Sequence, residues 1–80
     1  MKASNISPAQ YWGKFFINSA NRQKVVLVSY IENIEELKDS TIFISDSKGR
    51  LLTPKGIRWD IFCNTYVPSM LNDYQFKLEN

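Results

Sequence analysis

The residues best suited to chemistry lie between positions 48 and 58, where the chain carries four cationic side chains and no acidic one. Basic side chains can contact phosphates, and an adjacent aromatic ring can stack on a base. The pattern is typical of a small nucleic-acid-binding module formed by Lys48, Arg50, Lys55, Arg58 and Trp59. The alternative is a solvated turn followed by a core tryptophan. We favour this alternative because four cations supply only modest, salt-sensitive affinity for nucleic acids; the net charge of +2 is also small for a nucleic-acid-binding protein.

A second charged group lies in residues 32–39, where four acidic side chains surround the single base Lys38. The adjacent Glu35 and Glu36 raise the question of acid–base catalysis or metal binding. Neighbouring residues on a helix point about 100° apart, however, so their carboxylates do not converge on one substrate. We expect an acidic, solvated corner formed by Glu32, Glu35, Glu36 and Asp39.

Several absences argue against enzymatic chemistry. The chain contains no histidine, which removes the Ser–His and Cys–His nucleophile pairs and the commonest general base near neutral pH. Cys63 is the only cysteine and lies in an apolar stretch, as is typical of a buried structural thiol. Gly13, Gly49 and Gly56 are too scattered to cradle a phosphate. We expect a protein that is not an enzyme and uses no cofactor or metal.

Length and composition predict one folded domain spanning residues 1–80. Hydrophobic residues make up 44% and aromatic residues 14% of the chain, well above a disordered composition. Residues 1–24 lack the apolar segment of a secretion signal. The longest uninterrupted apolar run is four residues, whereas a membrane-spanning helix needs about 20. We expect a cytoplasmic protein without a membrane span.

Residues 25–31 form the most apolar run, and their β-branched and aromatic residues predict a central strand covered on both faces. Upstream, Ser7 as N-cap, Pro8 at the first helical position and Gln10 predict a helix start. The aromatic residues that follow fall at helical spacing, which predicts a helix with Trp12, Phe15, Phe16 and Tyr11 on one face. We expect that face to pack on the sheet. The alternative is an exposed stacking platform or protein-binding stripe.

The second half of the chain predicts mostly short elements. Ile34 and Leu37 indicate one helical turn, and residues 41–53 form a β-hairpin around Asp46 to Gly49. Residues 54–66 fit both a helix that starts at Thr53-Pro54 and an alternating strand, and we favour the helix. Residues 74–78 alternate as a final strand.

Together these elements predict the α+β class: an antiparallel sheet of three to four strands, with an N-terminal helix and a second helix on one face. The final strand is a candidate edge for a homodimer.

By exclusion, the sequence favours a small non-enzymatic binding protein that contacts another protein stoichiometrically, as a regulator, inhibitor or adaptor. Its size is typical of accessory proteins encoded by phages and mobile elements. Aromatic and arginine residues are the commonest anchors of protein interfaces, and charged residues steer association. The candidate contact residues are Trp12, Tyr30, Glu32, Glu35, Glu36, Arg50, Arg58, Trp59 and Tyr66. The nucleic-acid-binding module is the alternative.

Overall fold

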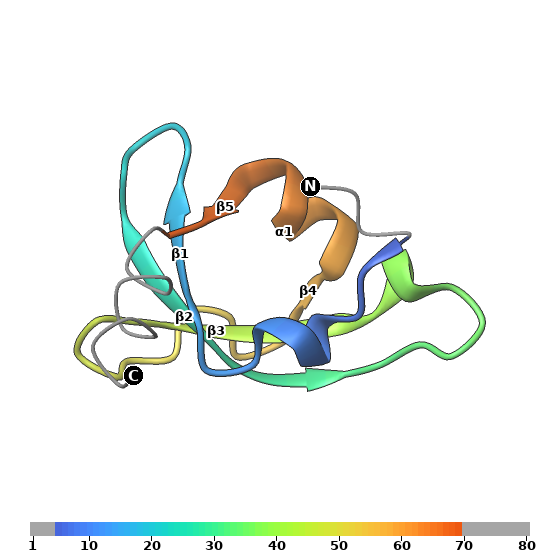
Figure 1. Ribbon diagram of the computed structural model, residues 1–80. Coiled ribbons are helices and arrows are strands. Elements are labelled where there is room, and N and C mark those ends of the chain that lie inside the picture. The colour runs from blue at the N-terminus through green and yellow to red at the C-terminus, as the bar shows by residue number, and fades with distance from the viewer. Residues whose placement is uncertain (1–4, 70–80) are drawn as a thin grey trace, which may run out of the picture.

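The computed structural model describes residues 5–69, which form one curled antiparallel sheet with the order β4-β3-β2-β1-β5 (Figure 1). Four strands follow one another as a meander, and the last strand returns to pair with the first. The curled sheet and α1 face each other across the core (Figure 1). The elements are η2 (Pro8–Tyr11), β1 (Phe15–Asn18), β2 (Lys24–Ile31), η3 (Leu37–Asp39), β3 (Thr41–Asp46), β4 (Ile57–Arg58), α1 (Trp59–Thr65) and β5 (Tyr66–Pro68).

The predicted fold class is therefore wrong in its counts. The described residues contain five strands and a single α-helix, in place of three to four strands and two helices. The candidate dimer edge, residues 74–78, lies outside the described residues. No helix within residues 5–69 combines the length and the hydropathy needed to cross a bilayer.

The predicted central strand is confirmed as β2, the middle strand of the sheet. The prediction that it is covered on both faces is wrong. Val25 and Leu27 are fully buried, whereas Val28, Ser29 and Ile31 are exposed. The difference arises because α1 lies on one face of the sheet, so only that face of β2 is packed into the core.

A β-bulge interrupts β2 at Val28. Leu27 pairs with Ile44 of β3, whereas the next pair joins Ser29 to Phe43, so Val28 is the extra residue. A bulge bends its strand and increases the local twist. On its other side, β2 pairs with β1 from Lys24 to Val26 and no further. Two backbone hydrogen bonds then join Leu27 to residues 13 and 14. Within the described residues, the last part of β2 therefore has a strand neighbour on one side only.

The predicted N-terminal helix is also wrong, although its start is confirmed. Ser7 is the N-cap of η2 and its hydroxyl accepts the N–H of Ala9. The 3₁₀ turn ends after Tyr11, and Gly13 then adopts a φ of +79°, a left-handed conformation that breaks the helix. The next residues join β1, where Phe16 pairs with Val25 and is fully buried. Pairing with β2 thus outweighs the helical spacing of the aromatic residues.

The helix in residues 54–66 is confirmed but shorter than predicted. Gly56 has a φ of +82°, and the two residues of β4 pair with Thr41 and Ile42 before α1 begins at Trp59. The start at Thr53-Pro54 is wrong because this strand pairing occupies the place of the first helical turn. The Trp59 backbone N–H donates to the Ser40 carbonyl at 2.8 Å, which joins the start of α1 to the loop before β3.

Two short elements were predicted beside β3, a helical turn before it and a hairpin turn after it. The hairpin turn is confirmed. The Asp46 carboxylate accepts the backbone N–H groups of Lys48 and Arg50. The return strand is reduced to one bridge between Ser45 and Leu51. The helical turn predicted from Ile34 and Leu37 begins only at Leu37, where the structure contains η3.

The core is built mainly from side chains of the sheet's inner face and α1. Phe62 stacks on Tyr66 with ring centroids 4.6 Å apart and meets Phe16 edge-on at 4.7 Å. Trp59 is fully buried, and its indole N–H donates to the Ile6 carbonyl at 2.8 Å. The buried hydrophobic residues are Phe16, Val25, Leu27, Ile42, Ile44, Trp59, Phe62, Cys63 and Tyr66.

Candidate protein-binding surface

Within residues 5–69, the three most exposed large hydrophobic side chains belong to the end of β2 or to the segments beside it. Ile34 is 91% exposed, Trp12 65% and Ile31 64%, and Val28 on the bulge is 38% exposed. These four residues come from the last half of β2, the loop after it and the C-cap of η2. The other exposed large hydrophobic residues of the described chain, Leu51, Ile61 and Val67, belong to three different elements or loops. A concentration of exposed apolar side chains of this kind marks an interaction site.

Trp12, Val28, Ser29 and Tyr30 form one part of this surface, which we call the aromatic corner; they line a hollow of about 230 Å³. The Trp12 indole N–H donates to the Val28 carbonyl at 2.9 Å, so the bulge holds the ring in place. The rings of Trp12 and Tyr30 lie 6.4 Å apart at an angle of 74°. Tyr30 is half-buried and packs against the core. The corner is therefore an exposed indole supported by a rigid base.

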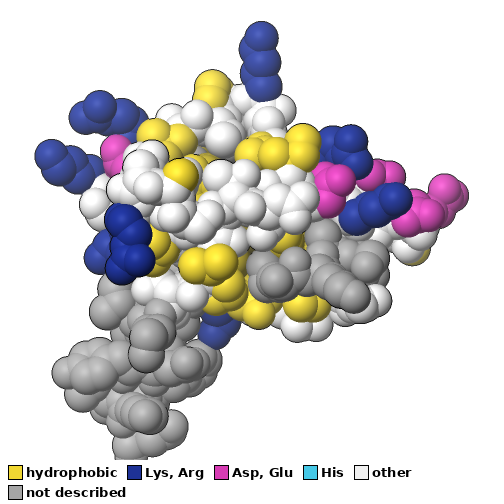
Figure 2. Space-filling model, turned by 90° about the horizontal axis from the view of Figure 1, so that it is seen from above, with side chains coloured by type: hydrophobic (Ala, Val, Ile, Leu, Met, Phe, Trp, Pro, Cys, Tyr) yellow, Lys and Arg dark blue, Asp and Glu magenta, His cyan; other side chains and the backbone are white. Residues whose placement is uncertain are grey.

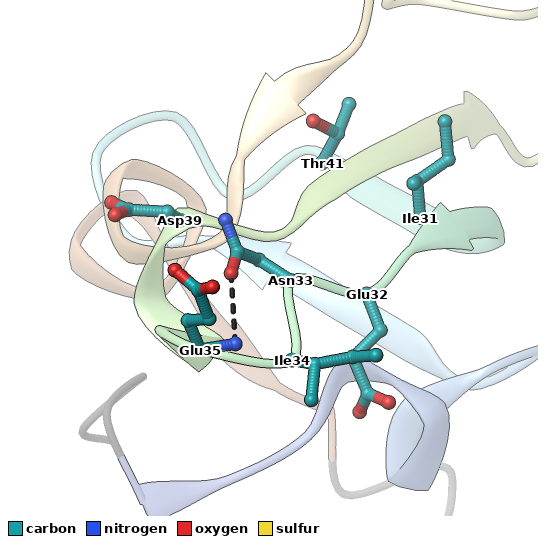
Figure 3. Close-up of a pocket in the computed structure, with 7 residues that line it drawn as sticks. All are labelled: Ile31, Glu32, Asn33, Ile34, Glu35, Asp39 and Thr41. Carbon is teal, nitrogen blue, oxygen red and sulfur yellow. Dashed lines mark hydrogen bonds between the residues drawn. The ribbon is translucent and has the colours of Figure 1, made fainter.

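A second hollow of about 440 Å³ lies beside the loop that follows β2, and its lining includes Ile31 and Ile34 (Figure 3). Asn33 shapes this loop. Its side-chain oxygen accepts the N–H groups of Glu35 and Glu36, and its own N–H donates to the Ser40 hydroxyl. The whole lining comprises Ile31, Glu32, Asn33, Ile34, Glu35, Asp39 and Thr41.

Glu32 belongs to the lining of the second hollow and also bonds the short turn η2. Its carboxylate accepts a hydrogen bond from the Ser7 hydroxyl, the N-cap of η2, while Trp12 caps the other end of that short turn. Figure 3 shows the side chains of Ile31 and Glu32 on opposite sides of the chain. Because side chains alternate along extended chain, Glu32 shares the side of Tyr30. The Glu32 side chain thus points to the same side of the chain as Tyr30, and Ile31 points to the other side (Figure 3).

The fold places most charges of the described residues at two ends of the sheet, and Lys14 and Lys55 are counted in neither end. Val25 pairs with Asp46 at one end of β2, and Ile31 pairs with Thr41 at the other. The basic end carries four cations and one carboxylate, Arg22, Lys24, Lys48, Arg50 and Asp46, a net charge of +3. The acidic end carries five carboxylates and two cations, Glu32, Glu35, Glu36, Asp39, Asp60, Lys38 and Arg58, a net charge of −3. Figure 2 shows most of the visible carboxylates on one side of the molecule.

Among the predicted contact residues, the structure brings together Trp12 and Tyr30, and it leaves Glu32, Glu35 and Glu36 exposed after the end of β2. Arg50 lies at the opposite, basic end. The other three residues, Arg58, Trp59 and Tyr66, already have partners within the protein. Arg58 donates to Asp39 and Asp60 at 2.9 Å each, and both Trp59 and Tyr66 are core residues.

Sequence reasoning missed Val28, Ser29, Ile31 and Ile34. The first three belong to the run that was expected to be buried on both faces, and the bulge that exposes them has no signature in the sequence. Ile34 was expected to be the apolar side of a helical turn. A lone isoleucine among acidic residues was the available signal for its exposure.

The predicted nucleic-acid site loses its aromatic platform. Trp59 is fully buried and its indole N–H is already bonded, so the ring cannot stack on a base. Lys48, Arg50 and Lys55 are exposed, but Arg58 is held by two carboxylates at the acidic end. The four predicted cations therefore do not form one surface.

Cys63 lies in α1 with 7% of its surface exposed. Burial raises the pKa of its thiol to about 11, which suppresses the reactive thiolate at neutral pH. Within residues 5–69 the structure contains no group of three or more Cys, Asp or Glu side chains placed to hold a metal ion.

Comparisons of the chain with protein-family models, curated protein sequences and solved structures find no match.

Proposed function

We propose that this protein is a small, non-enzymatic binding protein that acts by stoichiometric contact with another protein, as a regulator, inhibitor or adaptor. The observation that supports this function is the position of the three most exposed large hydrophobic residues in the part of the chain that the structure describes. Ile34, Trp12 and Ile31 all lie around the end of β2, beside two hollows. An apolar surface of this kind is stabilised when a partner covers it.

Trp12 is the expected anchor of the interface. Tryptophan is enriched among the few residues that carry most of the binding energy in protein complexes. The bond from its indole to the Val28 carbonyl and the contact with Tyr30 restrict its motion before binding. A side chain that is already ordered loses less conformational entropy when a partner binds. Trp12 is thus both exposed and pre-organised.

The exposed carboxylates of Glu35 and Glu36 are placed to steer a partner toward this surface. Charges at the rim of an interface change the association rate more than the final affinity. Replacing both residues with lysine should therefore slow association at low salt, with little effect at high salt, and should leave the fold intact because both side chains are exposed. An unchanged association rate at low salt would count against steering.

The experiment that tests this function is purification of the tagged protein from its native host, with and without nuclease, followed by mass spectrometry. Three variants should be compared with the parent: Trp12→Ala, Ile34→Ser and, as the matched control, Leu51→Ala. Leu51 is also an exposed hydrophobic residue, at 47%, but lies away from the end of β2. Each variant should first be shown to be folded by circular dichroism.

We expect one protein to remain bound after nuclease treatment, to form a complex of fixed stoichiometry, and to bind Leu51→Ala as well as the parent. Trp12→Ala should weaken binding by about tenfold or more, as for a hot-spot residue. Because Ile34 is 91% exposed, its replacement cannot act by disturbing the core. Equal binding by all three variants would refute the surface. Loss of all bound material on nuclease treatment would favour the nucleic-acid alternative through the basic end.

A further inference from the structure

The aromatic corner has the shape and surroundings of a receptor for one cationic side chain. We propose that it binds an arginine side chain within a basic segment of the partner protein. This inference rests on the proposed function and specifies the chemistry of the partner at one point of the interface.

The size of the hollow favours a single side chain. Its volume of about 230 Å³ is below the range of about 300–1,000 Å³ that is typical of small-molecule sites. It is lined by two aromatic residues, one valine and one serine. A metabolite would leave most of its surface in solvent here, whereas the end of one long side chain fits.

The two rings provide the walls that a guanidinium group prefers. Trp12 and Tyr30 meet at 74°, so a cation in the angle between them can contact an aromatic face. Tryptophan is the strongest cation–π partner among the aromatic side chains. Arginine also stacks its planar group on an aromatic ring, which the compact ammonium of lysine cannot do. The geometry therefore favours arginine over lysine.

The acidic end next to the corner favours a cation over an apolar anchor, although Lys14, two residues after Trp12, adds one positive charge nearby. By the alternation of side chains along the chain, Glu32 points to the side of Tyr30, and its carboxylate accepts a hydrogen bond from the Ser7 hydroxyl. The acidic end as a whole carries a net charge of −3. These charges attract a basic segment and repel an acidic one. The basic end of the molecule, with a net charge of +3, lies at the other end of β2 and does not cancel this field locally.

Amide and indole NMR spectra of the full chain offer a direct test. The probes are two capped hexapeptides, one of alternating glycine and arginine and one of alternating glycine and lysine, titrated at equal ionic strength. The protein has two indole N–H groups. Trp12 reports on the corner, and the buried Trp59 provides an internal reference because it is bonded to the Ile6 carbonyl.

We expect the arginine peptide to shift the indole resonance of Trp12 and the amides of Ser29, Tyr30 and Glu32, while the Trp59 indole stays in place. The lysine peptide should bind about two- to fivefold more weakly, the difference expected for a cation–π contact at an exposed site. Trp12→Ala should abolish the preference for arginine. Glu32→Gln, which keeps an oxygen for Ser7, should weaken both peptides, and Leu51→Ala should change neither.

Three outcomes would overturn the inference: no shift at Trp12, equal binding of both peptides, or a preference for arginine that survives Trp12→Ala. A peptide that ends in phenylalanine and binds better than the arginine peptide would assign the corner to an apolar anchor and overturn it as well. None of these results changes the outcome of the capture experiment. A captured protein whose binding is weakened by Trp12→Ala would still support the proposed function. Failure of capture together with an arginine-specific shift would contradict the proposed function alone.

Discussion

Replacing Gly56 with alanine should destabilise the fold strongly, for two separable reasons. Gly56 has a φ of +82°, a left-handed conformation that costs an L-residue about 1–2 kcal/mol. A Cβ at this position would also lie 2.5 Å from the Thr41 methyl group and 3.3 Å from the Phe43 ring. Forcing an extra carbon into a packed site costs about 1–3 kcal/mol. Adding the two contributions, we expect Gly56→Ala to lower the free energy of unfolding by about 2–5 kcal/mol.

Urea denaturation followed by circular dichroism measures this change, and the chain offers a matched control. Gly49 has nearly the same φ, +85°, but no atom lies within 4 Å of an added Cβ. Gly49→Ala should therefore show the conformational cost alone, about 1–2 kcal/mol. Thr41→Ser removes the clashing methyl group, so the double variant with Gly56→Ala should recover part of the loss. Equal destabilisation by the two alanine variants, or no recovery in the double variant, would refute the steric argument.

Three further predictions concern charged and titratable groups. Arg58→Met removes a half-exposed guanidinium that bonds two carboxylates, so it should cost about 0.5–1 kcal/mol in urea denaturation, and the loss should shrink in 1 M salt. The Arg50 backbone N–H holds the pKa of Asp46 below its ordinary value of 3.8. Its ionised form therefore stabilises the fold above that value and loses this effect as the pH falls through the folded pKa, so the stability difference between the parent and Asp46→Asn should vanish in acid. Because burial raises the pKa of Cys63 to about 11, its reaction with a thiol reagent at pH 8 should be about 100-fold slower in the native protein than in urea. Conversely, the neutral thiol favours folding below its unfolded pKa, and this contribution should be lost as the pH rises through 11.

The parts of the fold that could be predicted are those that local chemistry decides. Ser7 caps a turn because its hydroxyl reaches an N–H two residues away, and Asp46 does the same for the hairpin. The apolar run from Val25 has few alternatives to a strand. The predicted N-terminal helix failed because Phe15 and Phe16 fit both a helical and an alternating pattern. Pairing with β2 decides between the two patterns, and this pairing depends on residues outside the segment itself.

The candidate site shows the same division. Trp12, Tyr30 and Glu32 could be named from residue type alone, because exposed aromatic and charged groups are the usual contact residues. Trp59 could not be excluded from the sequence. Its burial depends on the Ile6 carbonyl, 53 residues away in the chain, which satisfies the indole N–H. Both indoles donate to a backbone carbonyl, yet Trp12 is exposed and Trp59 is buried, and only the tertiary contacts separate them.

The irregularity in β2 connects the fold to its surface. Pairing with β1 stops near Leu27 because Gly13 turns the chain away, and the bulge at Val28 follows at once. A strand segment without a neighbour on one side exposes backbone groups that can pair with other chains. Here the Trp12 indole donates to the Val28 carbonyl and satisfies one of these groups. Covering the edge does not require an exposed ring, since a buried aromatic side chain would exclude water as well. That Trp12 bonds the bulge and still keeps 65% of its surface in solvent is therefore better explained by a contact that the protein makes with a partner than by the needs of its own fold.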